Sequence, residues 1–94
     1  MKDNTASVME MIEETVRQLE AWGMFKLKAL EFKHAYMQIL TLAQKSVKYW
    51  LAIGKPLGEA VSRTYQAAVE ADVNTGTDNA PIVKAMLEIL YPDA

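Results

Sequence analysis

The chain contains no cysteine, which excludes disulfides, thiolate metal sites and cysteine nucleophiles together. It has one histidine and no periodicity typical of strands, so it cannot form the strand–turn–helix motif that presents a serine nucleophile. The loop at residues 54–58 lacks the longer glycine pattern that cradles phosphate. We therefore predict that the protein is not an enzyme, has no catalytic residues and uses no cofactor.

Long apolar runs are also missing. The most apolar window, residues 35–53, contains Gln38, Gln44, Lys45 and Lys48, too many polar groups for a membrane span. The first five residues are polar and lack the apolar core of a signal peptide. We expect no transmembrane segment and a cytoplasmic protein.

Glycine and proline are scarce, with four and three in 94 residues, while 51% of the residues are hydrophobic and 23% are charged. Such a balance favours a packed globule over a disordered chain, and the length suits one domain covering residues 1–94. Residues 24–53 contain no breaker at all, which predicts one long central helix. The fold class that we expect is all-α, a small bundle of about four helices.

Helical spacing of apolar residues supplies the other elements. The first helix is expected to begin near Asn4 or Thr5, with a buried seam formed by Met9, Ile12, Val16 and Leu19. Gly23 is the expected break before the long helix, whose main apolar stripe comprises Phe25, Ala29, Phe32, Tyr36, Ile39, Leu40, Ala43, Val47 and Trp50.

The second half of the chain is divided by clear turn signals. Residues 54–58 end the long helix, and a third helix is expected over about residues 57–71. Residues 72–79 form a loop in this interpretation. A last helix is capped by Asp78 or Asn79 and stops at Pro92; because it is apolar on more than one side, it is either central or docked in another protein's groove.

The long helix carries apolar residues on more than one side, since Leu30 and Met37 lie away from the main stripe. At about 1.5 Å per residue it would be about 45 Å long, more than the short helices of so small a chain can cover. A second copy of the chain is the simplest way to cover the remaining apolar side of the long helix, so we expect an intertwined or side-by-side homodimer.

Formal charge is unevenly divided, at minus three before Phe25, plus five over residues 26–55 and minus four thereafter. The simple interpretation is a set of solvated faces. The alternative is a small regulatory nucleic-acid-binding protein that uses the lysine-rich central helix, with phosphate contacts from Lys26, Lys33, Lys45, Lys48 and Lys55.

Glu31 and His34 stand at the three-residue spacing found in di-iron helical bundles. A complete site needs two such pairs and two more carboxylates, and one pair is common by chance, so we predict no metal site. The leading hypothesis is a non-enzymatic helical protein–protein interaction module of the adaptor, chaperone or inhibitor type, acting as a homodimer. The residues expected to contact the partner protein are Phe25, Phe32, Tyr36, Trp50, Met86 and Leu90.

Overall fold

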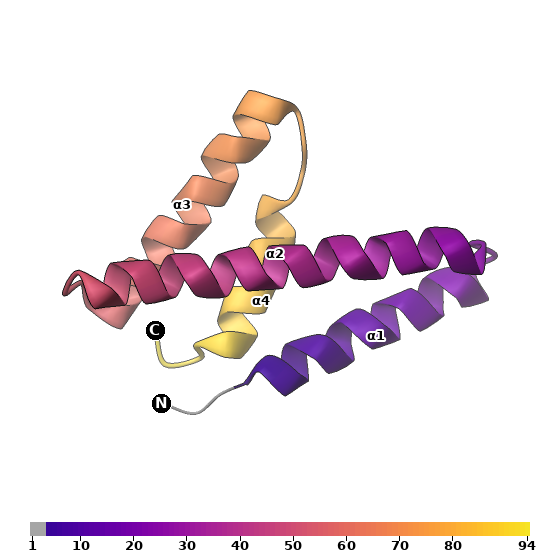
Figure 1. Ribbon diagram of the computed structural model, residues 1–94, viewed down its shortest axis with the longest axis horizontal. Coiled ribbons are helices and arrows are strands. Elements are labelled where there is room, and N and C mark those ends of the chain that lie inside the picture. The colour runs from indigo at the N-terminus through magenta and orange to yellow at the C-terminus, as the bar shows by residue number, and fades with distance from the viewer. Residues whose placement is uncertain (1–3) are drawn as a thin grey trace.

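The computed structural model describes residues 4–94, and those residues form four α-helices and no strand. Helix α1 spans Thr5–Ala21, α2 spans Lys26–Ala52, α3 spans Leu57–Thr75 and α4 spans Ala80–Leu90. The expectation of an all-α bundle of about four helices with one long helix is thereby confirmed. In Figure 1, α1 runs alongside α2, while α3 and α4 cross α2 at steep angles.

Glycine ends the first two helices by the same device. Gly23 and Gly54 have φ values of 98° and 94°, in the left-handed region that side chains avoid. Around each glycine the amide of the following residue reaches back five residues, from Met24 to the carbonyl of Leu19 and from Lys55 to that of Trp50, both at 3.0 Å. These bonds define Schellman motifs, so Gly23 breaks the helix and does not merely bend it.

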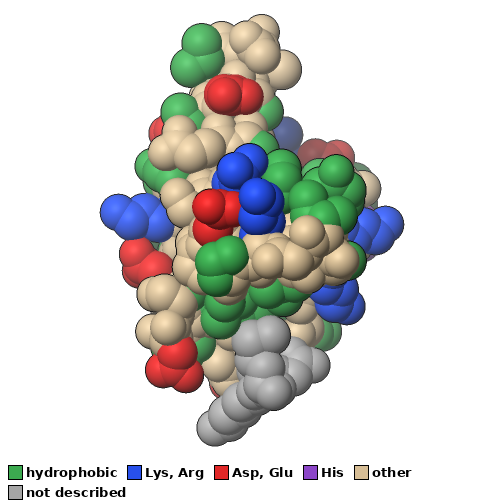
Figure 2. All heavy atoms as spheres, turned by 90° about the vertical axis from the view of Figure 1, so that its left-hand side faces the viewer, with side chains coloured by type: hydrophobic (Ala, Val, Ile, Leu, Met, Phe, Trp, Pro, Cys, Tyr) green, Lys and Arg blue, Asp and Glu red, His purple; other side chains and the backbone are tan. Residues whose placement is uncertain are grey.

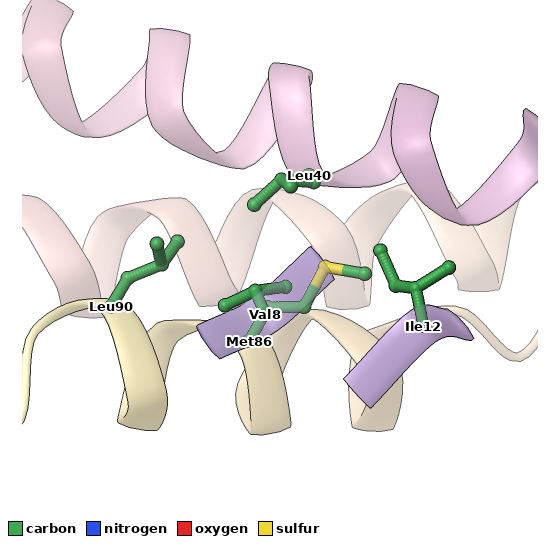
Figure 3. Packing of buried hydrophobic residues seen from close by; sticks show 5 residues of the cluster. All are labelled: Val8, Ile12, Leu40, Met86 and Leu90. Atoms are coloured by element: carbon green, nitrogen blue, oxygen red, sulfur yellow. The ribbon is translucent and has the colours of Figure 1, made fainter. Parts of the chain in front are cut away.

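One cluster of buried residues joins α1, α2 and α4 (Figure 3). Val8 and Ile12 of α1, Leu40 of α2, and Met86 and Leu90 of α4 point toward one another and are at most 3% exposed. Full burial of such side chains contributes about 1.5–3 kcal/mol each. The start of α1 is also tied to α4, because the Asn4 side chain donates to the Ile89 carbonyl at 3.0 Å and makes no capping bond to its own helix.

A second cluster joins α2, α3 and α4. It contains Ala43 and Val47 of α2, Ala60 of α3, and Val83 and Leu87 of α4. The small residues Ala43 and Ala60 allow helix axes to approach closely. Helices α2 and α4 both contribute to the two clusters. Helix α4 is therefore packed inside the bundle, one of the two roles that its apolar sequence suggested.

Two details of the sequence interpretation are wrong. The buried seam of α1 contains Val8, whereas Met9 is 38% exposed, so the seam begins one residue earlier than expected. Helix α3 continues to Thr75, beyond the expected end at residue 71. No breaker occurs before Gly76, whose φ of 69° ends the helix, and the polar residues before it are held by the helical backbone.

The molecule is flat, with Cα extents of 45 × 32 × 15 Å and a radius of gyration of 14.1 Å. A compact chain of this length has a radius of gyration of about 12.4 Å. The accessible surface of 6340 Å² exceeds by about 900 Å² the roughly 5,400 Å² typical of a 10.5 kDa monomer. Residues 1–3, which lie outside the described part, account for at most about 550 Å² even when counted as fully exposed. The four helices therefore cover one another less completely than is usual.

Candidate interaction surface

The six residues predicted to contact a partner separate into three groups. Phe25 is 85% exposed at the turn between α1 and α2, next to Trp22, which is 78% exposed. Phe32, Tyr36 and Trp50 are half-buried. The rings of Phe32 and Tyr36 lie 6.0 Å apart, and Tyr36 packs on the cluster shown in Figure 3.

Met86 and Leu90 form the third group, and they are core residues with exposures of 0% and 3%. Helix α4 directs them toward α1 and α2, as Figure 3 shows. Their side chains are already occupied within this chain. The surface available to a partner must therefore be sought elsewhere, above all on α2.

Helix α2 leaves one side uncovered along its whole length. Ala29 and Val47 are fully buried on the inner side, and Gln38 lies nine residues from each, which is two and a half turns and therefore the opposite side. We call the side centred on Gln38 the outer face of α2. Large apolar side chains that lie on it are Leu27 at 73%, Leu42 at 66%, Tyr49 at 58% and Ile53 at 52% exposure, the last just past the helix end.

None of those four residues is among the six that the sequence interpretation assigned to the partner surface. It placed the second apolar group of the long helix at Leu30 and Met37, of which Leu30 is 44% exposed and Met37 packs on the core. A signal was present, because Leu27 and Tyr49 lie eleven residues on either side of Gln38, and eleven residues are close to three helical turns. Without the tertiary structure, nothing showed which of several stripes the other helices would cover.

The corner between α2 and α3 combines an aromatic pair with three charges. The Arg63 guanidinium lies 4.6 Å from the centre of the Trp50 ring, a cation–π contact, and Tyr49 packs edge-on against Trp50 at 5.1 Å. Glu59 pairs with Arg63 at 3.3 Å and with Lys55 at 3.7 Å. Figure 2, which views the molecule from the side of this corner, shows basic and acidic side chains clustered beside hydrophobic ones. Trp50 is therefore held in place from two sides.

An apolar hollow of about 350 Å³ opens between α2, α3 and α4. Ala67, Ala68 and Ala71 of α3 form one wall and Ile39 and Leu42 of α2 the other. Helix α3 diverges from α2 (Figure 1), and the alanine side chains are too small to fill the space between the two helices, so a hollow remains.

Asp72, at the edge of that hollow, replaces the local cap expected for α4. Its carboxylate accepts hydrogen bonds from the amides of Asn79 at 2.9 Å and Ala80 at 2.7 Å and from the Thr77 hydroxyl at 2.7 Å. These donors, the Asn79 amide first, lower the pKa of Asp72 below its ordinary value of 3.8. Asp72 thereby fastens the end of α3 to the start of α4, and the side chain of Asn79 makes no capping bond.

Helical spacing places Lys26, Lys33 and Lys48 of the nucleic-acid alternative on one side of α2, whereas its other two lysines lie elsewhere. Lys33 is half-buried, only seven residues from the core residue Leu40 and hence on nearly the same side of α2. Lys45 lies seven residues from Gln38 and belongs to the outer face. Lys55 is committed to Glu59 at the α2–α3 corner.

Glu31 and His34 are both exposed, and Glu31 pairs with Lys28 at 3.5 Å. Among residues 4–94, no three histidine, cysteine or acidic side chains are grouped so that they could hold a metal ion. In the same part of the chain, no helix has the length and apolar character needed to cross a bilayer.

Comparisons with protein-family models, curated proteins and solved structures find no match.

Proposed function

We propose that this protein is a non-enzymatic helical interaction module that acts as a homodimer and binds other proteins as an adaptor, chaperone or inhibitor. The observation that carries the proposal is the uncovered outer face of α2. Of the nine large hydrophobic residues that are exposed among residues 4–94, four lie on this face, and Trp22 and Phe25 lie at the turn before it. Scattered exposed hydrophobics are normal on a monomer, but a row along one helix is typical of a protein interface.

The surface area is consistent with this proposal. A stable interface buries about 800 Å² on each partner. The accessible surface of this chain exceeds the monomer expectation by about 900 Å², of which at least about 350 Å² lies outside residues 1–3. Nucleic-acid binding stays the second candidate. Of its five lysines, Lys45 lies on the outer face of α2 and Lys55 pairs with Glu59, which leaves three on one side of the helix.

Sedimentation equilibrium over a concentration series tests the proposal. The wild-type chain is expected to approach twice its 10.5 kDa mass at high micromolar concentration. Leu27→Glu places a charge in the apolar part of the interface and should shift the protein toward monomer, because an unpaired buried charge is costly.

Val73→Glu is the matched control, since Val73 is 78% exposed on α3, away from the outer face of α2. It should leave the association unchanged. Circular dichroism should show the same helix content for all three proteins. A wild-type chain that stays monomeric at high micromolar concentration contradicts the proposed function.

A further inference from the structure

Seven residues of the outer face of α2 have a symmetric spacing. One of them is Gln38 itself, and the others lie four, seven and eleven residues before it and after it. All seven are exposed. At about 100° per residue these steps keep every member within about 40° of Gln38. The set consists of Leu27, Glu31, His34, Gln38, Leu42, Lys45 and Tyr49.

Residue types within this set are complementary under reversal of the helix direction. A two-fold axis through Gln38 places residue 38 plus n of one copy opposite residue 38 minus n of the other. Lys45 then faces Glu31 and Tyr49 faces Leu27, each pair occurring twice, while Leu42 packs beside His34 and Gln38 meets its own copy. We propose that the second copy binds here, with the two α2 helices antiparallel and centred on Gln38. This inference rests on the proposed function, because it specifies the dimer that the function requires.

The outer face of α2 is open among residues 4–94, although the same axis also sets Lys48 opposite Lys28 at the edge of the face. In Figure 1, α2 passes in front of α4, so the side of α2 opposite to α4 is turned toward the viewer. The side chains by which α2 is fastened to α1 and α3, Gln44 to Thr5 at 2.7 Å and Ser46 to Thr64 at 2.8 Å, lie on its flanks. Eleven residues span three turns of about 3.67 residues, close to the natural helix, so two nearly straight helices can stay in contact over about 33 Å.

The ends of the paired helices are also apolar. Because α2 is reversed in the second copy, the turn carrying Trp22 and Phe25 comes to lie near the partner's last helical turn, where Ile53 is 52% exposed. Trp22 and Phe25 are 78% and 85% exposed in the single chain, and aromatic residues of this kind dominate interface energies. The charge pairs determine the register and the apolar pairs supply the area.

Cross-linking at the axis is the sharpest test, because the chain contains no cysteine that could give a background reaction. Gln38→Cys places one thiol of each copy beside the two-fold axis, within the 4.4–6.8 Å between Cα atoms that a disulfide requires. Mild oxidation should convert most of this variant to a covalent dimer on a non-reducing gel.

Leu27→Cys and Tyr49→Cys are the matched controls. Each alone should remain uncross-linked, since the same residue in the second copy lies about 33 Å away. A mixture of the two variants should cross-link, because residues 27 and 49 face each other across the interface.

Charge exchange tests the register by an independent route. Glu31→Lys and Lys45→Glu should each weaken the dimer by at least about 10-fold, since like charges then oppose each other twice. The double substitution should restore the affinity, and a mixture of the two single variants should form heterodimers. Glu70→Lys on α3 changes the net charge as Glu31→Lys does and should have no such effect.

The two proposals fail in different ways. If the wild-type chain is dimeric but Gln38→Cys does not cross-link and the charge exchange does not restore affinity, the antiparallel register is wrong and the dimer stands. If the wild-type chain is monomeric at high micromolar concentration, both proposals are refuted.

Discussion

Leu40 and Leu42 are a matched pair for testing which side of α2 faces the core. They have the same side chain and lie two residues apart on one helix, yet Leu40 is 2% exposed and Leu42 is 66% exposed. Truncating a fully buried leucine to alanine costs about 2–5 kcal/mol, from lost transfer free energy and the cavity left behind. Full burial of a leucine is worth about 1.5–3 kcal/mol, so truncating one that is only a third covered should cost less than about 1 kcal/mol.

Urea denaturation followed by circular dichroism measures both costs. At low micromolar concentration, Leu40→Ala should lower the free energy of unfolding by about 2–5 kcal/mol, and its Tm should fall by at least about 8 °C. Leu42→Ala should be close to wild type. The m-value should stay the same for all three proteins, because the surface exposed on unfolding changes little.

Protein concentration adds a second comparison. Association stabilises the folded state by mass action, so the wild-type Tm should rise with concentration. Leu42→Ala should lose part of that rise, since its side chain lies in the proposed interface. Equal costs for the two substitutions at low concentration, or a larger cost for Leu42→Ala, would refute the orientation of α2 and every inference drawn from its outer face.

Two further predictions concern the α3–α4 connection. The folded-state pKa of Asp72 is lowered, so its contribution to stability is complete above its unfolded value of about 3.8 and is lost as the pH falls through the folded value. Asp72→Ala should therefore lower the Tm at pH 7, and its difference in Tm from wild type should narrow near pH 2. Asp78→Ala should have little effect at either pH. If the difference in Tm between Asp72→Ala and wild type is the same at both pH values, the role of the charge is contradicted. Gly76→Ala should destabilise the protein by about 1 kcal/mol, because φ is 69° at that position. Gly58→Ala should stabilise it by about 0.4–1 kcal/mol, because Gly58 lies in the first turn of α3 and no atom lies within 4 Å of the added Cβ. Thermal unfolding measures both changes. Effects of equal sign would show that the αL cap is not the feature that ends α3.

Flatness links the fold to the proposed function. Helices α3 and α4 cross α2 on its inner side, and α1 lies along one flank, so residues 4–94 contain no further helix to cover the outer face. A larger chain would cover that face with another helix. In this chain a second copy can supply the cover, and the symmetric spacing about Gln38 gives the copy a defined position.

The local sequence of this protein determined its helices. Glycines at positions 23 and 54, each free to adopt positive φ, mark the ends of α1 and α2, and periodic apolar residues identify the helices themselves. Errors occurred where a local signal competed with a tertiary one. The turn-forming residues after Asp72 suggested a loop, but helix α3 continues to Thr75, and Asp72 bonds to a segment seven and eight residues later in the chain.

Burial, by contrast, was decided only by the tertiary structure. Helical spacing shows that apolar residues share a side of α2, but it carries no information about which sides α1, α3 and α4 will occupy. For that reason the sequence predicted partner contacts at Met86 and Leu90, which lie in the core, and none at Leu42 and Tyr49, which lie outside it. The physical cause is that helix formation depends on neighbours within about four residues, whereas exposure depends on residues such as Leu40 and Met86 that are far apart in sequence and meet only in the folded chain.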